Sequence, residues 1–315
     1  MSVVSFGEVL IDFVALESGV TVGEASGFVK APGGAPANVA VAVARLGRPA
    51  AFLGQVGDDP FGHFLAGVLA DSGVDVTGLR FSGAARTALA FVSLAADGDR
   101  SFVFYRHPSA DMLMRPEDVA LDVIDRYAVF HFGSITMIGE PSRSATLRAV
   151  EYALAAGKLV SYDPNLRLAL WPDAAAARAG MLAGLDYAHI VKVSEEEVEF
   201  MAGTAGVRAL WRDRTRLIVV TRGAGGARLF TRAAEYSAPG YSVAPVDTTG
   251  AGDGFVAGLL VGLLDHPDDY TEQIDDLLRF ANAVGALTTT KKGAIPALPT
   301  EAEVRALMRA AAPRA

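Results

Sequence analysis

The chain of 315 residues is too long for a minimal domain and fits one large α/β domain with a small appendage. It has no cysteine, which excludes disulfides, thiolate zinc sites and cysteine nucleophiles, and its net charge of −8 argues against a general nucleic-acid or anionic-membrane binder. No apolar run reaches the roughly 18 uncharged residues of a membrane span, and the N-terminus lacks a basic segment and a cleavage site, so we expect a soluble, cytoplasmic protein.

The opening segment, SVVSFGEVLIDFV, is almost continuously apolar, as in a strand buried on both faces of a parallel sheet, and this strand is expected to end at Asp12. A helix rich in Ala and Val is expected at Pro36–Leu46, then a strand at Ala51–Val56 and a helix at Pro60–Asp71. Further strands, separated by helical segments, are expected at Ala128–Ser134, Lys158–Asp163, His189–Ser194 and Arg216–Thr221. This alternation predicts an α/β fold with a doubly wound, mainly parallel sheet flanked by helices.

One region departs from this alternation. Residues Thr87–Arg106 alternate apolar and polar on both sides of Asp97-Gly98, a dipeptide suited to a type I′ hairpin turn. Together with the glycine-punctuated stretch Ala15–Lys30, they predict a small antiparallel sheet that serves as a lid or a dimer contact. We therefore expect one domain over residues 1–315, with a lid formed by roughly 13–30 and 86–108.

The stretch DTTGAGDGF, Asp247–Phe255, directly precedes an apolar helix. Taken alone, Asp253 is a favoured residue for capping that helix. Gly250 and Gly252, however, leave the N–H groups of the first turn unshielded, which favours an anion site. A carboxylate beside a bound phosphate suits a base in phosphoryl transfer. Both interpretations of Asp253 stay open at this point.

The usual nucleotide and metal fingerprints are missing from the sequence. The nearest approach to a P-loop, Gly57–His63, lacks the lysine, and neither a strand–GxGxxG–helix motif nor HExxH occurs. A dehydrogenase is therefore disfavoured, and His131, in an apolar strand, is expected to be a core residue. In APGGAPANVAV, Gly33 and Gly34 precede a helix whose first turn holds Asn38, which predicts either a ligand-binding turn or a tight packing turn.

Taken together, GGAPANVAVAVARLG and DTTGAGDGFVAGLL resemble the two signatures of the ribokinase-like (PfkB) carbohydrate kinases. The resemblance covers nearly the whole chain: Ala281–Ala294 is similar to the family's adenine-side helix and loop, and the predicted hairpin falls where the family has its lid. Within the family, the stretches ARTALAFVSL, FYRHPSADMLM and SYDPNLRLALWP look most like fructokinases. Ribokinases usually have lysine after the paired glycines, and Ala35 at that position counts against ribose.

The resemblance implies an ATP-dependent kinase that converts fructose to fructose 6-phosphate. Asp253 would be the general base, and the N–H groups of Gly250, Ala251 and Gly252 would form the anion hole. The implied sugar contacts are Asp12, Gly33, Gly34, Asn38, Arg106, Arg167 and Asp253. For each of the two arginines, a plain surface charge is an equal alternative.

On the nucleotide side, the resemblance implies contacts from Lys192, Ser194, Thr221, Gly223, Gly226, Gly250, Gly252 and Asn282. Glu197 would organise Mg²⁺ through water, although a solvated acidic helix start is an alternative, and Ser194 stands where the family often has Asn. A monovalent cation, K⁺, is implied beside the anion hole at Asp247, Thr249 and Gly293.

Two other functions remain open. A 2-keto-3-deoxygluconate kinase of the same family would use arginines placed like Arg106 and Arg167. A non-catalytic scaffold would be expected to have lost GAGD, which is intact here. The expected partners are a sugar and ATP, with no nucleic acid and no membrane. Apolar residues in the lid, among them Phe91, Phe102 and Phe104, favour a homodimer through the lid.

Overall fold

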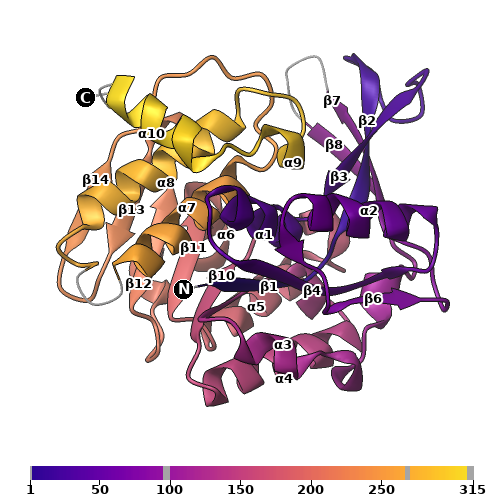
Figure 1. The fold of residues 1–315 in the computed structure, drawn as a ribbon, viewed down its shortest axis with the longest axis horizontal. Coiled ribbons are helices and arrows are strands. Elements are labelled where there is room, and N and C mark those ends of the chain that lie inside the picture. The colour runs from indigo at the N-terminus through magenta and orange to yellow at the C-terminus, as the bar shows by residue number, and fades with distance from the viewer. Residues whose placement is uncertain (1, 95–99, 267–269, 311–315) are drawn as a thin grey trace.

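The computed structural model describes residues 2–94, 100–266 and 270–310. Its centre is a sheet of ten strands in the order β14-β13-β12-β11-β10-β9-β1-β4-β5, with β6 also pairing with β4 (Figure 1). All pairs are parallel except β12–β13 and β13–β14, as expected for a doubly wound sheet. The strands are β1 (Val3–Phe6), β4 (Ala50–Gly57), β5 (Val74–Asp75), β6 (Leu79–Ser82), β9 (Val129–Gly133), β10 (Leu159–Asp163), β11 (Ile190–Ser194), β12 (Leu217–Thr221), β13 (Ala227–Phe230) and β14 (Glu235–Ala238).

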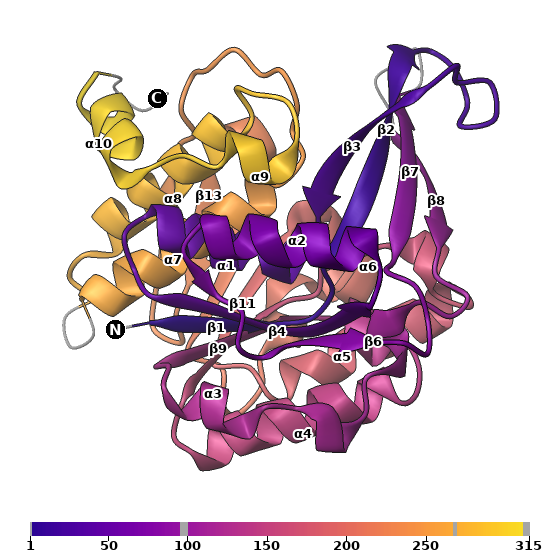
Figure 2. The ribbon, with the colours of Figure 1, turned by 45° about the vertical axis from the view of Figure 1, so that its right-hand side comes forward.

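Helices cover both faces of this sheet (Figure 2). One face packs against α1 (Ala35–Arg45), α2 (Pro60–Asp71), α7 (Ala251–Asp265), α8 (Ile274–Thr288), α9 (Ala294–Ala297) and α10 (Glu301–Ala310). The other packs against α3 (Leu121–Asp125), α4 (Ser142–Ala155), α5 (Ala174–Leu185) and α6 (Glu195–Ala202). Because side chains alternate along a strand, Val3 enters the first core and Val4 the second. This two-sided burial explains the apolar runs of the central strands.

The predicted elements of the main sheet are confirmed. Strands β4, β9, β10, β11 and β12 and helices α1 and α2 begin and end within one residue of their expected limits. Among the described residues, no helix has both the length and the apolar character needed to cross a membrane.

The opening segment is the exception. The structure divides it into β1 and a second strand, β2 (Leu10–Ser18), which leaves the main sheet. Asp12 therefore lies inside β2, and its predicted place at the end of a central strand is wrong. Both halves of the segment are apolar, and an apolar run alone does not tell one strand from two.

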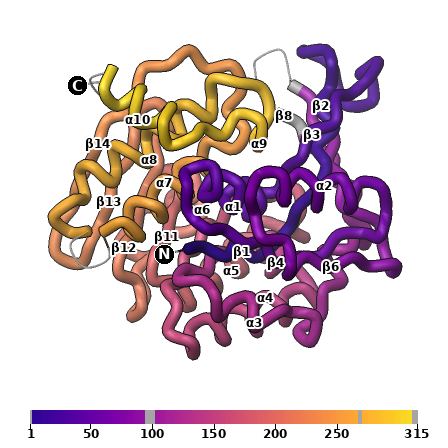
Figure 3. The backbone as a smooth tube through the Cα atoms, in the orientation of Figure 1, coloured from indigo at the N-terminus to yellow at the C-terminus, as the bar shows by residue number. Residues whose placement is uncertain are grey.

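β2 belongs to a second sheet of four strands, β3 (Phe28–Gly33), β2, β7 (Leu89–Leu94) and β8 (Arg100–Tyr105), in that order. This sheet stands away from the main body (Figure 2 and Figure 3). The outer pairs, β2–β3 and β7–β8, are antiparallel, as predicted. The middle pair, β2–β7, joins these two antiparallel pairs at their edges and is parallel. The predicted Asp97-Gly98 turn lies outside the described residues. Phe91 is opposite Val103, while Phe102 is opposite Val92, so Phe91 and Phe102 point to different faces.

Candidate active site

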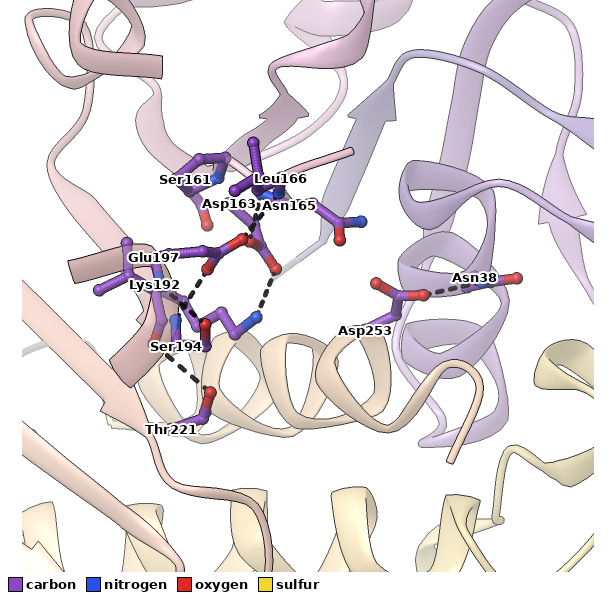
Figure 4. Close-up of polar contacts among 12 residues, drawn as sticks. Asn38, Ser161, Asp163, Asn165, Leu166, Lys192, Ser194, Glu197, Thr221 and Asp253 are labelled. Atoms are coloured by element: carbon purple, nitrogen blue, oxygen red, sulfur yellow. Dashed lines mark hydrogen bonds and ion pairs between the residues drawn. The ribbon is translucent and has the colours of Figure 1, made fainter. Parts of the chain in front are cut away.

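Polar side chains gather where three neighbouring parallel strands end. Asp163, Ser194 and Thr221 are the last residues of β10, β11 and β12. Because parallel strands end at the same edge of a sheet, these residues gather there: Ser194 is opposite Thr221, and Asp163 contacts Lys192 of β11. The N-terminus of α7 reaches the same place (Figure 4). Open α/β sheets bind ligands at this edge.

Helix α7 begins at a glycine and not at an aspartate. Gly250 is the N-cap residue, with a left-handed backbone at φ 78°, and no side chain caps the first turn. A Cβ at Gly250 would also lie 2.8 Å from the Cβ of Ala294, so the position needs glycine for two reasons. Asp253, three residues into the turn, makes no capping bond, and the capping interpretation of this residue is wrong.

The carboxylate of Asp253 points away from its own helix. It accepts a hydrogen bond of 2.7 Å from Nδ2 of Asn38, which comes from the first turn of α1 (Figure 4). Asp253 is only 8% exposed, and burial raises its pKa from 3.8 to about 6, although the bond from Asn38 lowers it. Asp253 is thus an ionised but only weakly stabilised carboxylate at neutral pH, as a general base should be.

A buried cation lies beside the same helix start. Nζ of Lys192 is 3.0 Å from Oδ2 of Asp163, and a Cβ at Gly252 would lie 3.2 Å from that ammonium. Burial lowers the pKa of Lys192, but the carboxylates of Asp163 and Glu197 outweigh it, so the pKa is raised. No side chain caps the first turn, although the N–H of Ala251 donates to the carbonyl of Thr248 at 3.3 Å. This turn and the Lys192 charge together favour an anion at this point.

The Ser194 and Glu197 side chains have structural partners of their own. They form a capping box at the start of α6: Oγ of Ser194 accepts from the N–H of Glu197, and one Glu197 oxygen accepts from the N–H of Ser194. The other Glu197 oxygen accepts from the N–H of Leu166 at 2.8 Å. Glu197 is buried, so the alternative of a solvated acidic residue does not hold.

The residues of the predicted sugar side come together around the start of α1. A Cβ at Gly33 would overlap the carboxylate of Asp12, and one at Gly34, whose φ is 109°, would overlap the carbonyl oxygen of Glu8. Oδ1 of Asn38 is buried without a hydrogen-bond partner among the described residues. A buried acceptor of this kind is costly unless a ligand satisfies it.

The two arginines differ. Arg106 is 4% exposed and pairs with Asp111, so it is no surface charge. It lines a cavity of about 270 Å³ together with apolar side chains that include Phe102, Phe104, Ile135 and Leu170. Arg167 is partly exposed and donates to the carbonyl of Leu166, and its charge lowers the pKa of Asp253 slightly.

Of the residues predicted for the nucleotide, Thr221 ends β12, Gly223 and Gly226 lie in the turn after it, and Asn282 lies on α8. Gly223 and Gly226 have positive φ angles of 53° and 89°, which favour glycine. The amide of Asn282, on α8, donates to the carbonyls of Ala238 and Pro239. It therefore ties α8 to the end of β14.

The three residues predicted to hold a monovalent cation are joined by hydrogen bonds. One oxygen of Asp247 accepts from the N–H and hydroxyl of Thr249 at 2.9 and 2.6 Å, and the other accepts from the N–H of Gly293 at 2.9 Å. Asp247 thus holds two loops together beside the start of α7. Within the described ranges, no group of three or more His, Asp or Glu side chains is arranged to hold a metal.

Sequence reasoning missed several buried carboxylates, among them Asp163, Glu8 and Asp111. Asp163 precedes Pro164 and Asn165, whose φ of 48° and N–H bond to Asp163 mark an Asx turn, a signal the motif DPN carries. Glu8 is hidden in an apolar run. The core interpretation of His131 is confirmed, since burial lowers its pKa to about 3 and it bonds to Ser161.

Known proteins are similar to the chain over almost its whole length. Fructokinase-1 of rice is 55% identical over 98% of both chains. A fructokinase from Xylella fastidiosa, solved with bound ATP, is 39% identical with a TM-score of 0.90 over 98% of both chains. A double mutant of the Vibrio cholerae fructokinase, solved with fructose, ADP and a potassium ion, is 38% identical with a TM-score of 0.87 over 98% of both. A putative ribokinase II from E. coli, solved with ATP and Mg²⁺, is 27% identical with a TM-score of 0.88, covering 98% of this chain and 99% of that one.

The family model for pfkB carbohydrate kinases matches residues 1–301. This match spans both sheets and all the site residues described above. The chain therefore belongs to the pfkB family of carbohydrate kinases.

Proposed function

We propose that this carbohydrate kinase transfers the γ-phosphoryl group of ATP to a hydroxyl of fructose and releases fructose 6-phosphate. The observation that carries the proposal is the buried Asp253 carboxylate at the uncapped, glycine-opened start of α7, beside Lys192. End-to-end similarity to fructokinases supports the choice of sugar.

In the proposed reaction, Asp253 accepts the proton of the sugar hydroxyl as that oxygen attacks the γ-phosphorus. A positioned base contributes about 10²- to 10⁴-fold in rate. The N–H groups of Gly250, Ala251 and Gly252 donate hydrogen bonds that stabilise the negative charge developing on the phosphoryl oxygens. The Lys192 ammonium adds a positive charge at the same place.

The sugar is proposed to lie between the start of α1 and the second sheet, which acts as a lid. Its hydroxyls would donate to the partnerless Oδ1 of Asn38 and to the carboxylate of Asp12. Gly33 and Gly34 are proposed to meet the sugar with their backbone; a Cβ at Gly33 would displace the Asp12 carboxylate, and one at Gly34 would meet the carbonyl oxygen of Glu8. Arg106 and Arg167 complete the site.

ATP is proposed to lie over the ends of β11 and β12, with Lys192 at a phosphate and Ser194, Thr221, Gly223, Gly226 and Asn282 around the nucleoside. Each oxygen of Glu197 already accepts a hydrogen bond from a backbone N–H. The remaining lone pairs of this carboxylate suit a water molecule bound to Mg²⁺ better than direct coordination of the ion. Mg²⁺, when bound, offsets the phosphate charge. Asp247, Thr249 and Gly293 hold together the loops that would supply oxygen ligands to K⁺.

The alternative substrate, 2-keto-3-deoxygluconate, is favoured by one observation. Arg106 is buried, lines the cavity of about 270 Å³ and has an Nε with no hydrogen-bond partner among the described residues, so it could meet a substrate carboxylate. Comparing kcat/KM for fructose and for this keto acid decides between the two. An active enzyme that strongly prefers the acid would overturn the fructose assignment.

A homodimer through the lid, in the cytoplasm, is proposed as the working form. The lid sheet exposes large apolar side chains, namely Leu16, Val29, Val103 and Tyr105, at 63%, 55%, 41% and 62%. In the strand register Val29 pairs with Val14, whereas Val103 pairs with Phe91, so Val29 and Val103 point to opposite faces of the lid and each face exposes an apolar side chain. Contiguous exposed apolar surface is typical of protein interfaces. Light scattering should give twice the chain mass of 32.8 kDa, and a double variant Val29→Lys, Val103→Lys should give the monomer mass.

A coupled ADP-release assay tests the proposed function. A panel of fructose, ribose, other hexoses and the keto acid is assayed with ATP, Mg²⁺ and K⁺. Fructose should give the highest kcat/KM. If ADP release by the wild-type protein does not exceed that of Asp253→Asn with any sugar, the protein is a non-catalytic scaffold.

A further inference from the structure

Glu8 is a buried carboxylate with no part in the reaction proposed above. It lies in the three-residue connection between β1 and β2 and is 3% exposed. Its Oε1 accepts a hydrogen bond of 3.2 Å from the N–H of Ala35, the first residue of α1. Its carbonyl oxygen lies so close to Gly34 that a Cβ there would approach it to 2.5 Å. Glu8 therefore touches the sugar-side turn with both its main chain and its side chain.

The charged groups that act on Glu8 lie at the same end of the lid, where the register sets Ile11 of β2 level with Tyr105 of the edge strand β8. Arg106 follows β8, and Asp111 lies in a short 3-10 turn, Ala110–Leu113, that packs against β4. Arg106 pairs with Asp111, whose second oxygen accepts from the hydroxyl of Ser109. Burial raises the pKa of Glu8 to about 7, although the charge of Arg106 lowers it, and Asp111 raises it further. Glu8 is thus bonded to the start of α1, and the charges of the buried Arg106–Asp111 pair at the base of the lid act on it.

We propose that Glu8 is a positioning residue for sugar binding, which holds the first turn of α1 in register with Arg106. The inference rests on the proposed function, because that turn and Arg106 are the two sides between which the sugar is proposed to lie. The hydrogen bond from the N–H of Ala35 holds the Glu8 carboxyl group at the start of α1, where the helix dipole favours it. The attraction between the ionised Glu8 and Arg106 fixes the side on which Arg106 lies.

Two substitutions separate these contacts. Glu8→Gln keeps an oxygen acceptor for Ala35 but cannot ionise, whereas Glu8→Ala loses both contacts. Glu8→Ala should raise the KM for fructose about tenfold at every pH, with kcat and the KM for ATP within about threefold of wild type. For Glu8→Gln, the ratio of its fructose KM to that of wild type should be near one at pH 6 and about threefold at pH 8.5. Titration of Asp253 affects both enzymes alike and cancels in this ratio.

The control variant is Asp75→Asn. Asp75 is a partly buried carboxylate that pairs with Arg126 and accepts from Tyr127, near the start of β4 and away from the sugar side. The Asp75→Asn variant should be less stable than wild type but should have the same KM for fructose. Fructose binding by calorimetry, without nucleotide, gives the same comparison independently of turnover, and thermal unfolding identifies variants that do not fold.

The inference is overturned if folded Glu8→Ala and Glu8→Gln both keep a fructose KM within twofold of wild type at all pH values. It is also overturned if their loss is entirely in kcat, or if the Glu8→Gln ratio does not change with pH. These outcomes leave an active wild-type fructose kinase. If wild type neither binds nor phosphorylates any sugar, the proposed function fails first, so the two failures are distinguishable.

Discussion

Asn38 donates a 2.7 Å hydrogen bond to Asp253 across 215 residues of sequence, and this bond joins the starts of α1 and α7. The oxygen of the same amide is buried and has no hydrogen-bond partner within the described part of the chain. One side chain thus orients the proposed base and offers an acceptor to the sugar. The bond also lowers the pKa of Asp253 against the larger effect of burial.

The first prediction concerns this bond. Asn38→Ala removes the donor, so the pKa of Asp253 should rise above about 6, and the acid limb of kcat/KM for the sugar should move up by about one pH unit. A pH–rate profile at saturating ATP measures the shift. Asn282→Ala, which removes an amide on the nucleotide side, is the control and should leave the limb in place. An unmoved limb in Asn38→Ala would show that the bond does not tune the base.

The second prediction separates catalysis from stability at Asp253. Because burial raises the folded pKa from 3.8 to about 6, the folded chain binds the proton more tightly than the unfolded chain. Its contribution to stability is complete below pH 4 and is lost as the pH rises through 6. Asp253→Asn should therefore lose most turnover, yet above pH 6 it should be more stable than wild type, by at most about 3 kcal/mol.

Denaturant unfolding at pH 4 and pH 7.5, beside kcat at pH 7.5, tests this prediction. The stability gain should appear only at the higher pH. Near-normal kcat in Asp253→Asn would remove Asp253 from the role of base. If the difference in unfolding free energy between Asp253→Asn and wild type is the same at both pH values, the pKa of Asp253 is not raised in the folded chain.

The third prediction concerns the approach of Lys192 to α7. A methyl group at position 252 would lie 3.2 Å from Nζ of Lys192, a distance at which the ammonium must move by a few tenths of an ångström. Gly252→Ala should thus lower kcat about tenfold, while the fructose KM stays within about twofold. Gly67→Ala on α2 is the matched control, because no atom lies within 4 Å of the added Cβ. A Gly252→Ala enzyme with wild-type kcat would show that this approach does not matter.

The sequence predicted local features better than long-range ones. The strand at Ile190–Ser194 and the helix at Pro60–Asp71 follow from apolar patterning and turn residues, which act over a few positions. Asp12 was assigned to the wrong sheet, because nothing in a continuous apolar run marks where β1 ends. The contacts of Asp253 with Asn38, and of Glu8 with Ala35, depend on how distant segments pack, which no local pattern encodes.

The fourth prediction concerns Asp247, whose two oxygens hold Thr249 on one loop and Gly293 on another. If these loops bind K⁺ beside the anion hole, turnover should rise several-fold when a bulky organic cation is replaced by K⁺ at constant ionic strength. Asp247→Asn keeps the size of the side chain but removes its charge and one of its two oxygens, so it should reduce this stimulation. Equal rates of the wild-type enzyme in the two salts would rule out a functional cation at this position. A stimulation that survives unchanged in Asp247→Asn would place the cation elsewhere, because the carboxylate charge would then contribute nothing to its binding.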